Sequence, residues 1–324
     1  MDVDIIVIPC MRMANPMAIE PMSLCLCCLQ TMSMMIPIRA TIRAKHEGFR
    51  NWRKILPLPS IPERDKIHAV SVVPISDPKI TPTVWGSSMP GCEAVLYPNA
   101  PGVKAVIREK CAALGVPLTV ADPDAIETLS RDLDGQRLRR GGLELWLPLL
   151  GDHQRYNTAV VLAVVEVLRR RGWRISDRNV QDGIAAVSWP GRFELLGRDP
   201  LFVLDGGHNP QCMEALLASA ETYLAGRPLT VITGVLADKD YADMYDRTAA
   251  LADRYFTVTP SNPRALSAED LAAWLSRYGK PAEPCASAAE AVNRALSATP
   301  RDGAVLAYGS LYLAAELRKA YLER

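Results

Sequence analysis

The sequence predicts an α/β fold in which helices cover both faces of a mostly parallel sheet. Short apolar runs alternate with amphipathic segments over the C-terminal half of the chain, a pattern typical of repeated strand–helix–strand units. Polar, glycine-bearing turns follow three of the apolar runs, and parallel sheets bind ligands beyond the carboxyl ends of their strands. A sharp change of composition near residue 90 separates this pattern from the sequence before it.

Composition and charge indicate an ordinary globular chain of about two domains. The chain has 324 residues, of which 49% are hydrophobic and 23% charged, and its net charge is +1. Such a balance provides no electrostatic attraction to nucleic acid or to an anionic membrane, so we expect neither as a partner. The eight cysteines show no framework spacing and "MDVDIIVIP" holds no basic residue. We therefore predict a cytoplasmic protein without a signal peptide, and a monomer.

Residues 1–90 differ in composition from the rest of the chain. Eight of the eleven methionines lie in the first 35 residues, and Gly48 is the only glycine before Gly86. A segment poor in glycine and rich in proline, without sustained periodicity, does not easily form the turns of a compact α/β domain. We leave this segment unassigned and expect non-native or disordered sequence, such as a frame-shifted, mis-started or fused piece.

From Glu93 onward, strands and helices can be predicted in order. Strands are predicted at "EAVLYP" (93–98) and "VPLTVAD" (116–122). Between them, apolar residues recur at helical spacing before Gly115, which stands where a C-cap is expected; they are Val103, Val106, Ile107, Cys111 and Leu114.

A hairpin arm and a long helix follow. The arm is "RRGGLELWLPL" (139–149), and the helix lies within "GDHQRYNTAVVLAVVEVLRRRGW" (151–173). Its apolar run from Ala159 to Leu168 is nearly continuous, which predicts a helix buried on most sides. Arg169–Arg171 suit the C-terminal end of the helix dipole, and Gly172 closes the helix.

After residue 188 the alternation becomes regular, and we place a domain boundary just before Trp189. The predicted strands are Leu201–Leu204, Leu229–Thr233, Tyr255–Val258 and Ala304–Tyr308. The predicted helices are 210–224, 241–252, 267–278, 287–298 and 310–322. Ser267 and Asp270 form an acidic variant of the capping box at the third helix.

The turn "LDGGHNP" (204–210) is the first candidate ligand-binding segment. Asp205 would emerge as the strand ends, where its carboxylate can accept hydrogen bonds from ribose hydroxyls. The two following glycines allow a tight turn and a close approach of a ligand to the backbone. His208 can position an anionic group. A simple capped turn, with Pro210 in the first helical turn, is the alternative.

Two further turns repeat this arrangement. They are "TGVLADKDY" (233–241) and "AYGSLY" (307–312), and in a parallel sheet all three would share one edge. Asp238 and Asp240 can serve equally as helix caps or as ligands. The second turn glycine of a hydrolase elbow is missing from "YGSLY", so we do not predict a serine nucleophile.

Five motifs together resemble the folylpolyglutamate synthases, including the bifunctional dihydrofolate synthases, of the Mur ligase superfamily. The resemblance covers about residues 93–324, and the ordered motifs are "LLGDHQRYNTAVVLAVVEVL", "WPGRFELL", "LFVLDGGHNP", "GVLADKDY" and "YGSLYLAAELR". It implies that residues 91–188 are the C-terminal remnant of a P-loop-type central ATPase domain. It also implies that residues 189–324 form the Rossmann-like Mur ligase C-terminal domain.

The resemblance implies an ATP-dependent amide ligase with a folate or pteroate substrate. ATP would phosphorylate a substrate carboxylate, and L-glutamate would attack the acyl phosphate; Mg²⁺ is the expected metal. By the same resemblance, Asn157 in "HQRYN", Arg192 in "WPGR" and Asp205 contact ATP, whereas His208 and Ser310 bind glutamate or assist domain closure. From the residues alone, Arg192 could be an interdomain ion-pair residue and Asn157 a satisfied helix amide.

The sequence departs from the family pattern in its first half. It contains no G-T-x-G-K-[ST] P-loop, and the family's magnesium ligands and carbamylated lysine segment are not recognisable. We therefore assign no catalytic residue and expect a truncated or impaired enzyme as written. Two other functions stay open. One is another Mur-type amino-acid ligase, and the other is a non-catalytic nucleotide-binding module that keeps the C-terminal domain.

Overall fold

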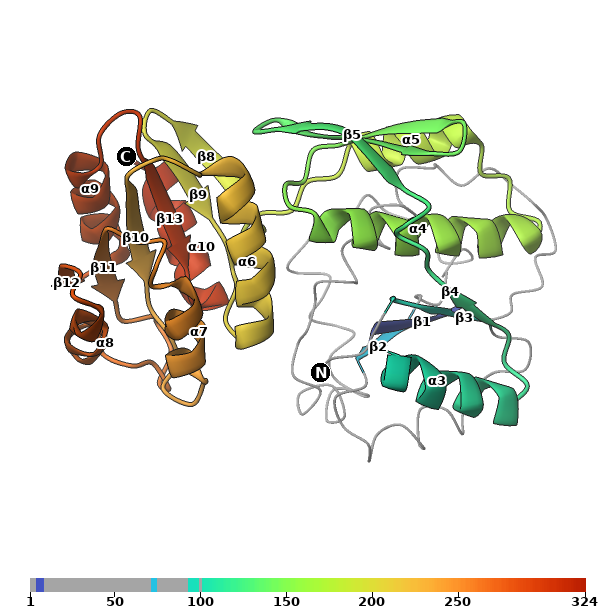
Figure 1. Ribbon diagram of the computed structural model, residues 1–324, viewed down its shortest axis with the longest axis horizontal. Coiled ribbons are helices and arrows are strands. Elements are labelled where there is room, and N and C mark those ends of the chain that lie inside the picture. The colour runs from blue at the N-terminus through green and yellow to red at the C-terminus, as the bar shows by residue number, and fades with distance from the viewer. Residues whose placement is uncertain (1–3, 9–70, 75–92, 99–100) are drawn as a thin grey trace, which may run out of the picture. The chain divides into compact units, whose positions relative to one another are not determined.

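The computed structural model describes residues 4–8, 71–74, 93–98 and 101–324 (Figure 1). The chain divides into two compact units. The first unit comprises residues 1–125 and 156–183, and the second comprises residues 126–155 and 184–324. The domain limits expected from the sequence, 1–90, 91–188 and 189–324, stay predictions.

The first unit contains a four-stranded sheet in the order β2-β1-β3-β4. Its strands are β1 (Asp4–Ile8), β2 (Ser71–Pro74), β3 (Glu93–Leu96) and β4 (Leu118–Val120). Helix α3 (Pro101–Ala113) connects β3 with β4, which pair in parallel, and it buries Ile107 and Cys111. Gly115 follows α3 with a φ of +63°, so the predicted C-cap is confirmed. Of the segment left unassigned, β1 and β2 are described; its other residues lie outside the described part.

Two more helices belong wholly or largely to the first unit, α4 (His153–Arg170) and α5 (Asp177–Ala185). The predicted burial of α4 is confirmed, because every residue from Ala159 to Leu168 except Glu166 is buried. Glu93 accepts hydrogen bonds from Arg170 and Arg171 at 2.7 and 3.2 Å, which joins β3 to the end of α4. Among the helices described, none has both the length and the apolar character needed to cross a membrane.

The second unit is built on a six-stranded sheet in the order β12-β11-β10-β13-β9-β8. Its strands are β8 (Glu194–Arg198), β9 (Leu201–Leu204), β10 (Leu229–Thr233), β11 (Arg254–Val258), β12 (Ala282–Cys285) and β13 (Ala304–Tyr308). All neighbours pair in parallel except β8, which is antiparallel to β9. The predicted mostly parallel sheet is confirmed. Strand β12 was missed because "AEPC" lacks an apolar run, and its proline is tolerated at the sheet edge.

Helices cover both faces of this sheet (Figure 1). One face packs on α6 (Pro210–Tyr223), α7 (Tyr241–Thr248) and α8 (Ala268–Leu275), and the other on α9 (Ala288–Ala298) and α10 (Leu311–Leu322). Successive strand residues point to opposite faces. Val203 of β9 therefore lies in the first cluster and Phe202 in the second.

The predicted cap at Ser267 is confirmed, and four further helices of this unit begin with the same chemistry. Each cap side chain accepts a backbone N–H from the first turn of its helix; the caps are Asn209, Asp240, Ser267, Ser287 and Ser310. Two helix ends differ from prediction. Helix α7 ends at Thr248 rather than at 252, and α8 gives way to the 3₁₀ turn η5 (Ser276–Tyr278).

A separate antiparallel sheet of the second unit has the order β5-β6-β7. Its strands are β5 (Glu127–Asp132), β6 (Gly135–Arg140) and β7 (Leu143–Leu147). The predicted hairpin arm is confirmed by β7, with Gly141 and Gly142 between β6 and β7. Strands β5 and β6 were missed because "ETLSRD" and "GQRLRR" are dominated by polar residues.

Buried hydroxyl groups connect β10, α7 and β13 inside the larger sheet's core. Thr233 Oγ1 bonds to the Tyr245 hydroxyl at 2.6 Å and donates to the Tyr308 carbonyl at 2.8 Å. Thr248 Oγ1 lies 2.7 Å from the Tyr308 hydroxyl. Burial raises the pKa of Tyr245 and Tyr308, since the charged phenolate is poorly solvated there. Both phenols therefore act as neutral hydrogen-bonding groups.

Thr233→Val tests the contribution of these bonds to stability. The substitution keeps the shape of the side chain but leaves the buried Tyr245 hydroxyl without its Thr233 partner, so we expect a loss of about 1–3 kcal/mol in the free energy of unfolding. Urea denaturation measures this loss. Thr222→Val is the matched control because the Thr222 hydroxyl is exposed and bonds only within its own helix. Equal losses in the two variants would contradict the role given to Thr233.

Candidate functional site

The turns after β9, β10 and β13 meet at one edge of the sheet. Gly309 N donates to the Gly207 carbonyl at 2.9 Å, which joins the third turn to the first. A Cβ at Gly309 would lie only 2.8 Å from the Gly234 carbonyl oxygen, and Gly309 has a φ of +121°. The expected convergence of the three turns is confirmed. Glycine is required at Gly309 by both its conformation and its surroundings.

Asp205 fixes a neighbouring loop to the end of β9. Its Oδ2 accepts the Phe193 N–H at 2.9 Å, and its Oδ1 accepts the Gly207 N–H at 2.6 Å. Gly206 N donates to the Gly191 carbonyl at 2.8 Å. Hydrogen bonds to an ionised acceptor are stronger than those between neutral groups. The loop of residues 191–193, called here the Arg192 loop, is thus held against the strand that ends at Asp205.

The other side of the Arg192 loop is held by an ion pair. Glu194 Oε2 accepts the Gly191 N–H at 2.8 Å, and Arg318 Nε lies 3.0 and 3.1 Å from the two Glu194 carboxylate oxygens. Phe193 has a φ of +42°, which is unusual for a residue with a side chain, yet it is only 1% exposed. Strained backbone is retained where the surroundings enforce it, often at functional sites.

The Arg192 side chain lies beside Gly206. A Cβ at Gly206 would be 3.0 Å from Arg192 Nη1 and 2.3 Å from Leu311 Cδ2. The guanidinium carbon is 6.0 Å from the centre of the Trp189 ring. Since the Asp205 carboxylate adjoins the same glycine, the structure brings an acid and a cation from different segments to one turn.

The other predicted site residues have the following places. His208 Nδ1 is 3.0 Å from the Gly206 carbonyl oxygen, so His208 shares the turn with Asp205. Ser310 is 2% exposed and caps α10, accepting the Tyr312 N–H at 3.2 Å. Asn157 lies on α4 within the first unit, whereas Arg192, Asp205, His208 and Ser310 lie in the second.

The two aspartates of the second turn have structural partners. Asp240 caps α7 by accepting the Asp243 N–H at 3.2 Å. Asp238 pairs with Arg264. The capping alternative therefore accounts for Asp240, and an exposed ion pair for Asp238.

His153 is a site residue that sequence reasoning missed. Its pKa is lowered chiefly by burial and further by the Arg192 charge, while Asp205 and Asp152 act in the opposite direction. His153 stands in the motif "HQRYN", but nothing in the spacing of the sequence places it within electrostatic reach of Asp205. His153 belongs to the second unit, together with Arg192 and Asp205.

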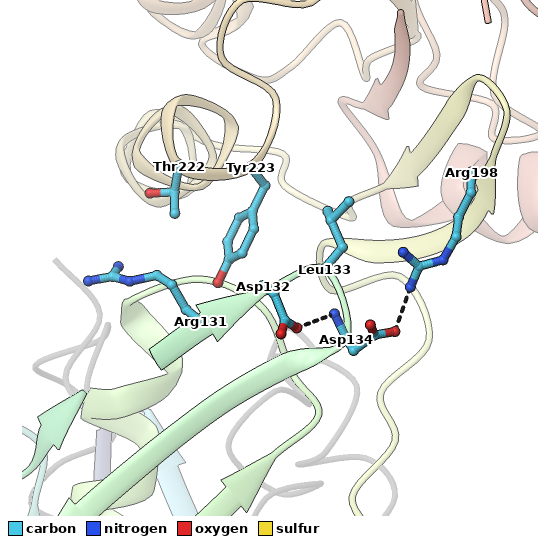
Figure 2. A pocket seen from close by; sticks show the side chains of 7 residues that line it. All are labelled: Arg131, Asp132, Leu133, Asp134, Arg198, Thr222 and Tyr223. Carbon is cyan, nitrogen blue, oxygen red and sulfur yellow. Dashed lines mark hydrogen bonds and ion pairs between the residues drawn. The ribbon is translucent and has the colours of Figure 1, made fainter. Parts of the chain in front are cut away.

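A separate pocket of about 370 Å³ lies between the β5–β6 turn, the end of α6 and β8 (Figure 2). Its charged side chains have partners inside or beside the pocket, and Arg131 lies 4.0 Å from the Asp152 carboxylate. Asp134 pairs with Arg198, and Asp132 Oδ1 accepts the Asp134 N–H at 2.8 Å. None of the predicted site residues lines this pocket. The pocket therefore does not bear on the roles predicted for those residues.

The magnesium ligands expected from the resemblance are not identified among the described residues. Within residues 4–8, 71–74, 93–98 and 101–324, no three His, Cys, Asp or Glu side chains are grouped so that they could hold a metal.

Asp205→Asn tests the anchoring of the Arg192 loop. An amide retains one acceptor oxygen, so it can accept only one of the two N–H groups without turning its own NH₂ toward the other. We expect the Phe193 or the Gly207 amide to exchange with solvent at least about tenfold faster. Hydrogen exchange followed by NMR measures this, with the Val231 amide in the sheet core as an internal control. Unchanged protection at both amides would contradict the anchoring role.

The lowered pKa of His153 predicts a pH-dependent stability. Below the ordinary histidine pKa of 6.5, the unfolded chain binds a proton before folded His153 does. We therefore expect the free energy of unfolding to fall as pH decreases through that value, and to level off below the folded pKa. Urea denaturation between about pH 8 and about pH 5 measures this, and His153→Gln should flatten the dependence. An identical pH dependence in the variant would refute the assignment.

Comparison with known proteins shows what the chain is similar to. Residues 191–311 match the family described as "Mur ligase, glutamate ligase domain". The folylpolyglutamate synthase of Lacticaseibacillus casei is 38% identical over 181 residues, which cover 55% of this chain and 41% of that protein.

Solved structures give the same result. Mycobacterium tuberculosis folylpolyglutamate synthase complexed with ADP and AMPPCP has a TM-score of 0.61 at 26% identity, covering 70% of this chain and 54% of that one. The bifunctional folylpolyglutamate synthase/dihydrofolate synthase from Yersinia pestis, complexed with AMPPNP and Mn ion, has a TM-score of 0.55 at 25% identity, covering 70% and 52%. The chain thus spans about half the length of these relatives. Residues 191–311 thus match a Mur ligase glutamate ligase domain, and the chain is similar to folylpolyglutamate synthases over the residues that it shares with them.

Proposed function

We propose that the chain acts in an ATP-dependent amide ligase that adds L-glutamate to a folate, with dihydropteroate as a possible second acceptor. The observation that carries this proposal is the Asp205-anchored Arg192 loop within a glutamate ligase domain. ATP would supply a phosphoryl group to the folate carboxylate, and glutamate would attack the resulting acyl phosphate. We further propose a cytoplasmic monomer.

The Arg192–Asp205 pair has the chemistry of a nucleotide site. Each Asp205 carboxylate oxygen accepts one backbone N–H and retains capacity for a second donor, such as a ribose hydroxyl. Arg192 supplies a planar cation suited to phosphate. The relatives complexed with ADP, AMPPCP or AMPPNP support the same ligand class. On this proposal Asn157 is a third contact to ATP, contributed by α4.

His208 and Ser310 are the proposed contacts to glutamate or to the closing domain. Both lie at the edge where the turns after β9 and β13 meet. His208 Nδ1 is directed to the Gly206 carbonyl, which leaves Nε2 for an external partner. The Ser310 hydroxyl accepts the Tyr312 N–H and can still donate its own proton.

A second function is favoured by one feature of the sequence, the lack of a G-T-x-G-K-[ST] motif. In Mur-type ligases this loop holds the nucleotide phosphates, and charge stabilisation of phosphoryl transfer is commonly worth several kcal/mol. The alternative is therefore a non-catalytic nucleotide-binding module. Another Mur-type amino-acid ligase is a third possibility, which differs from the first in the acceptor.

The nucleotide role of Asp205 is tested by Asp205→Ala and Arg192→Ala. Each removes one proposed contact, and we expect the affinity for AMPPNP to fall at least about tenfold, since a lost charged hydrogen bond costs about 1.5–3 kcal/mol. Isothermal titration calorimetry measures it. Asp182→Ala is the control, because Asp182 pairs only with Arg178 on the surface of α5. Wild-type affinity in both site variants would remove the basis of the proposal.

The reaction is tested by incubating the full chain with ATP, Mg²⁺, tetrahydrofolate and labelled glutamate. Labelled folylpolyglutamate is expected if the chain is itself a ligase. Nucleotide binding with neither product nor phosphate release would instead support the module. Dihydropteroate and a peptidoglycan precursor replace tetrahydrofolate in parallel reactions, which separate the three acceptor classes.

A further inference from the structure

Helix α10 contacts the candidate site at two points on one of its faces. A Cβ at Gly206 would collide with Leu311 Cδ2, so the first residue of α10 packs against the turn after β9. About two turns later, Arg318 Nε lies 3.0 and 3.1 Å from the two carboxylate oxygens of Glu194, the first residue of β8. Residues at this spacing lie on the same face of an α-helix. The helix therefore joins the turn after β9 to the segment that follows the Arg192 loop.

Gly191 is held through both polar groups of its backbone. Its N–H donates to Glu194 Oε2 at 2.8 Å, and its carbonyl accepts the Gly206 N–H at 2.8 Å. The first bond comes from β8 and the second from the turn after β9, so Gly191 is fixed from two sides. Its φ of +74° is one that a residue with a side chain rarely adopts. The next residue is Arg192, whose side chain starts from the position that these two bonds set.

Arg318 orients the Glu194 carboxylate as well as neutralising it. Its Nε lies at nearly equal distances from both oxygens, and one of them, Oε2, also accepts the Gly191 N–H. The Arg318 and Glu194 side chains are 37% and 20% exposed, against 79% and 49% for the surface pair of Arg178 and Asp182. Solvent and salt therefore screen the Arg318 pair less, and hydrogen bonds to charged groups are stronger than neutral ones. Without Arg318, the carboxylate would be free to turn away from Gly191.

We propose that Glu194 and Arg318 are positioning residues for Arg192, and that α10 acts through them on the affinity of the loop for nucleotide. The link to nucleotide rests on the proposed function. Arg318 orients the carboxylate, and the carboxylate holds the Gly191 N–H, so the Arg192 guanidinium is presented from a fixed backbone. Ser310 caps the same helix. The helix thus connects the turn proposed to bind glutamate with the loop proposed to bind ATP.

Three variants separate positioning from general stability. Glu194→Ala removes the acceptor of the Gly191 N–H. Arg318→Met leaves that acceptor in place and keeps an apolar stem, but removes the guanidinium that orients it. Arg247→Met is the matched control, because the Arg247 side chain is 39% exposed, against 37% for Arg318, and pairs with Asp243 of its own helix.

The first measurement is hydrogen exchange of the Gly191 amide, followed by NMR and normalised to the Val231 amide in the sheet core, which reports global unfolding. Exchange at Gly191 is expected to be at least about tenfold faster in Glu194→Ala and at least about threefold faster in Arg318→Met. Arg247→Met should match the wild type. Unchanged exchange at Gly191 in Arg318→Met, or equal acceleration in Arg247→Met, would overturn the proposal. Should Arg318→Met fail to fold, Arg318→Lys takes its place, since a lysine keeps the charge but not the planar group that orients the carboxylate.

The second measurement is AMPPNP affinity by isothermal titration calorimetry. Coupling through a second residue is typically worth about fivefold or more, so Glu194→Ala and Arg318→Met should each bind at least about fivefold more weakly than wild type. Arg318→Lys should recover part of the affinity lost in Arg318→Met, and Arg247→Met should bind as wild type does.

A pair that only stabilises the fold would give a different result. Arg318→Met and Arg247→Met would then lose similar free energies of unfolding in urea and keep wild-type affinity for AMPPNP, and this outcome would overturn the link to nucleotide. If the Gly191 amide responds as expected but no form of the protein, wild type included, binds AMPPNP, the proposed function fails and the positioning of the Arg192 loop stands.

Discussion

The Asp205 carboxylate is the interaction on which the arrangement of the candidate site depends. It accepts backbone N–H groups from Phe193 and Gly207, and so joins the end of β9 to a loop that precedes the whole sheet in sequence. A loop with a positive φ at Phe193 does not hold this form by its own preferences. The carboxylate, with the Glu194–Arg318 pair on the other side, holds it in place.

Close approach of backbone segments is the second constraint. Gly206 admits Arg192 and Leu311, Gly309 lies against the turn after β10, and Gly151 admits the ring of His153. Any side chain at these positions would collide with a neighbour, so these glycines are required by their surroundings, and Gly151 and Gly309 by their backbone conformation as well. The polar groups of the site are therefore brought together by segments that pack without side chains between them.

The parallel sheet explains why residues distant in sequence share one edge. Strands β9, β10 and β13 run in the same direction, so their carboxyl ends present Asp205, Gly234 and Ser310 to the same region. Apolar side chains from the strands fill the clusters on both faces of the sheet, and the turns at the strand ends carry the polar groups of the candidate site. Function in this fold is therefore concentrated in the turns.

The sequence alone determined the elements with strong local signals. Apolar runs specified β9, β10, β11 and β13, and the capping box at Ser267 specified where α8 begins, because both signals act within a few residues. The motifs indicated a resemblance to the folylpolyglutamate synthases and drew attention to Arg192 and Asp205. Only the tertiary structure decided the strands β5, β6 and β12, the strained φ of Phe193 and the burial of His153. Their conformations are set by strand pairing, buried hydrogen bonds and charges from remote segments. None of these interactions produces a periodic pattern in the amino-acid sequence.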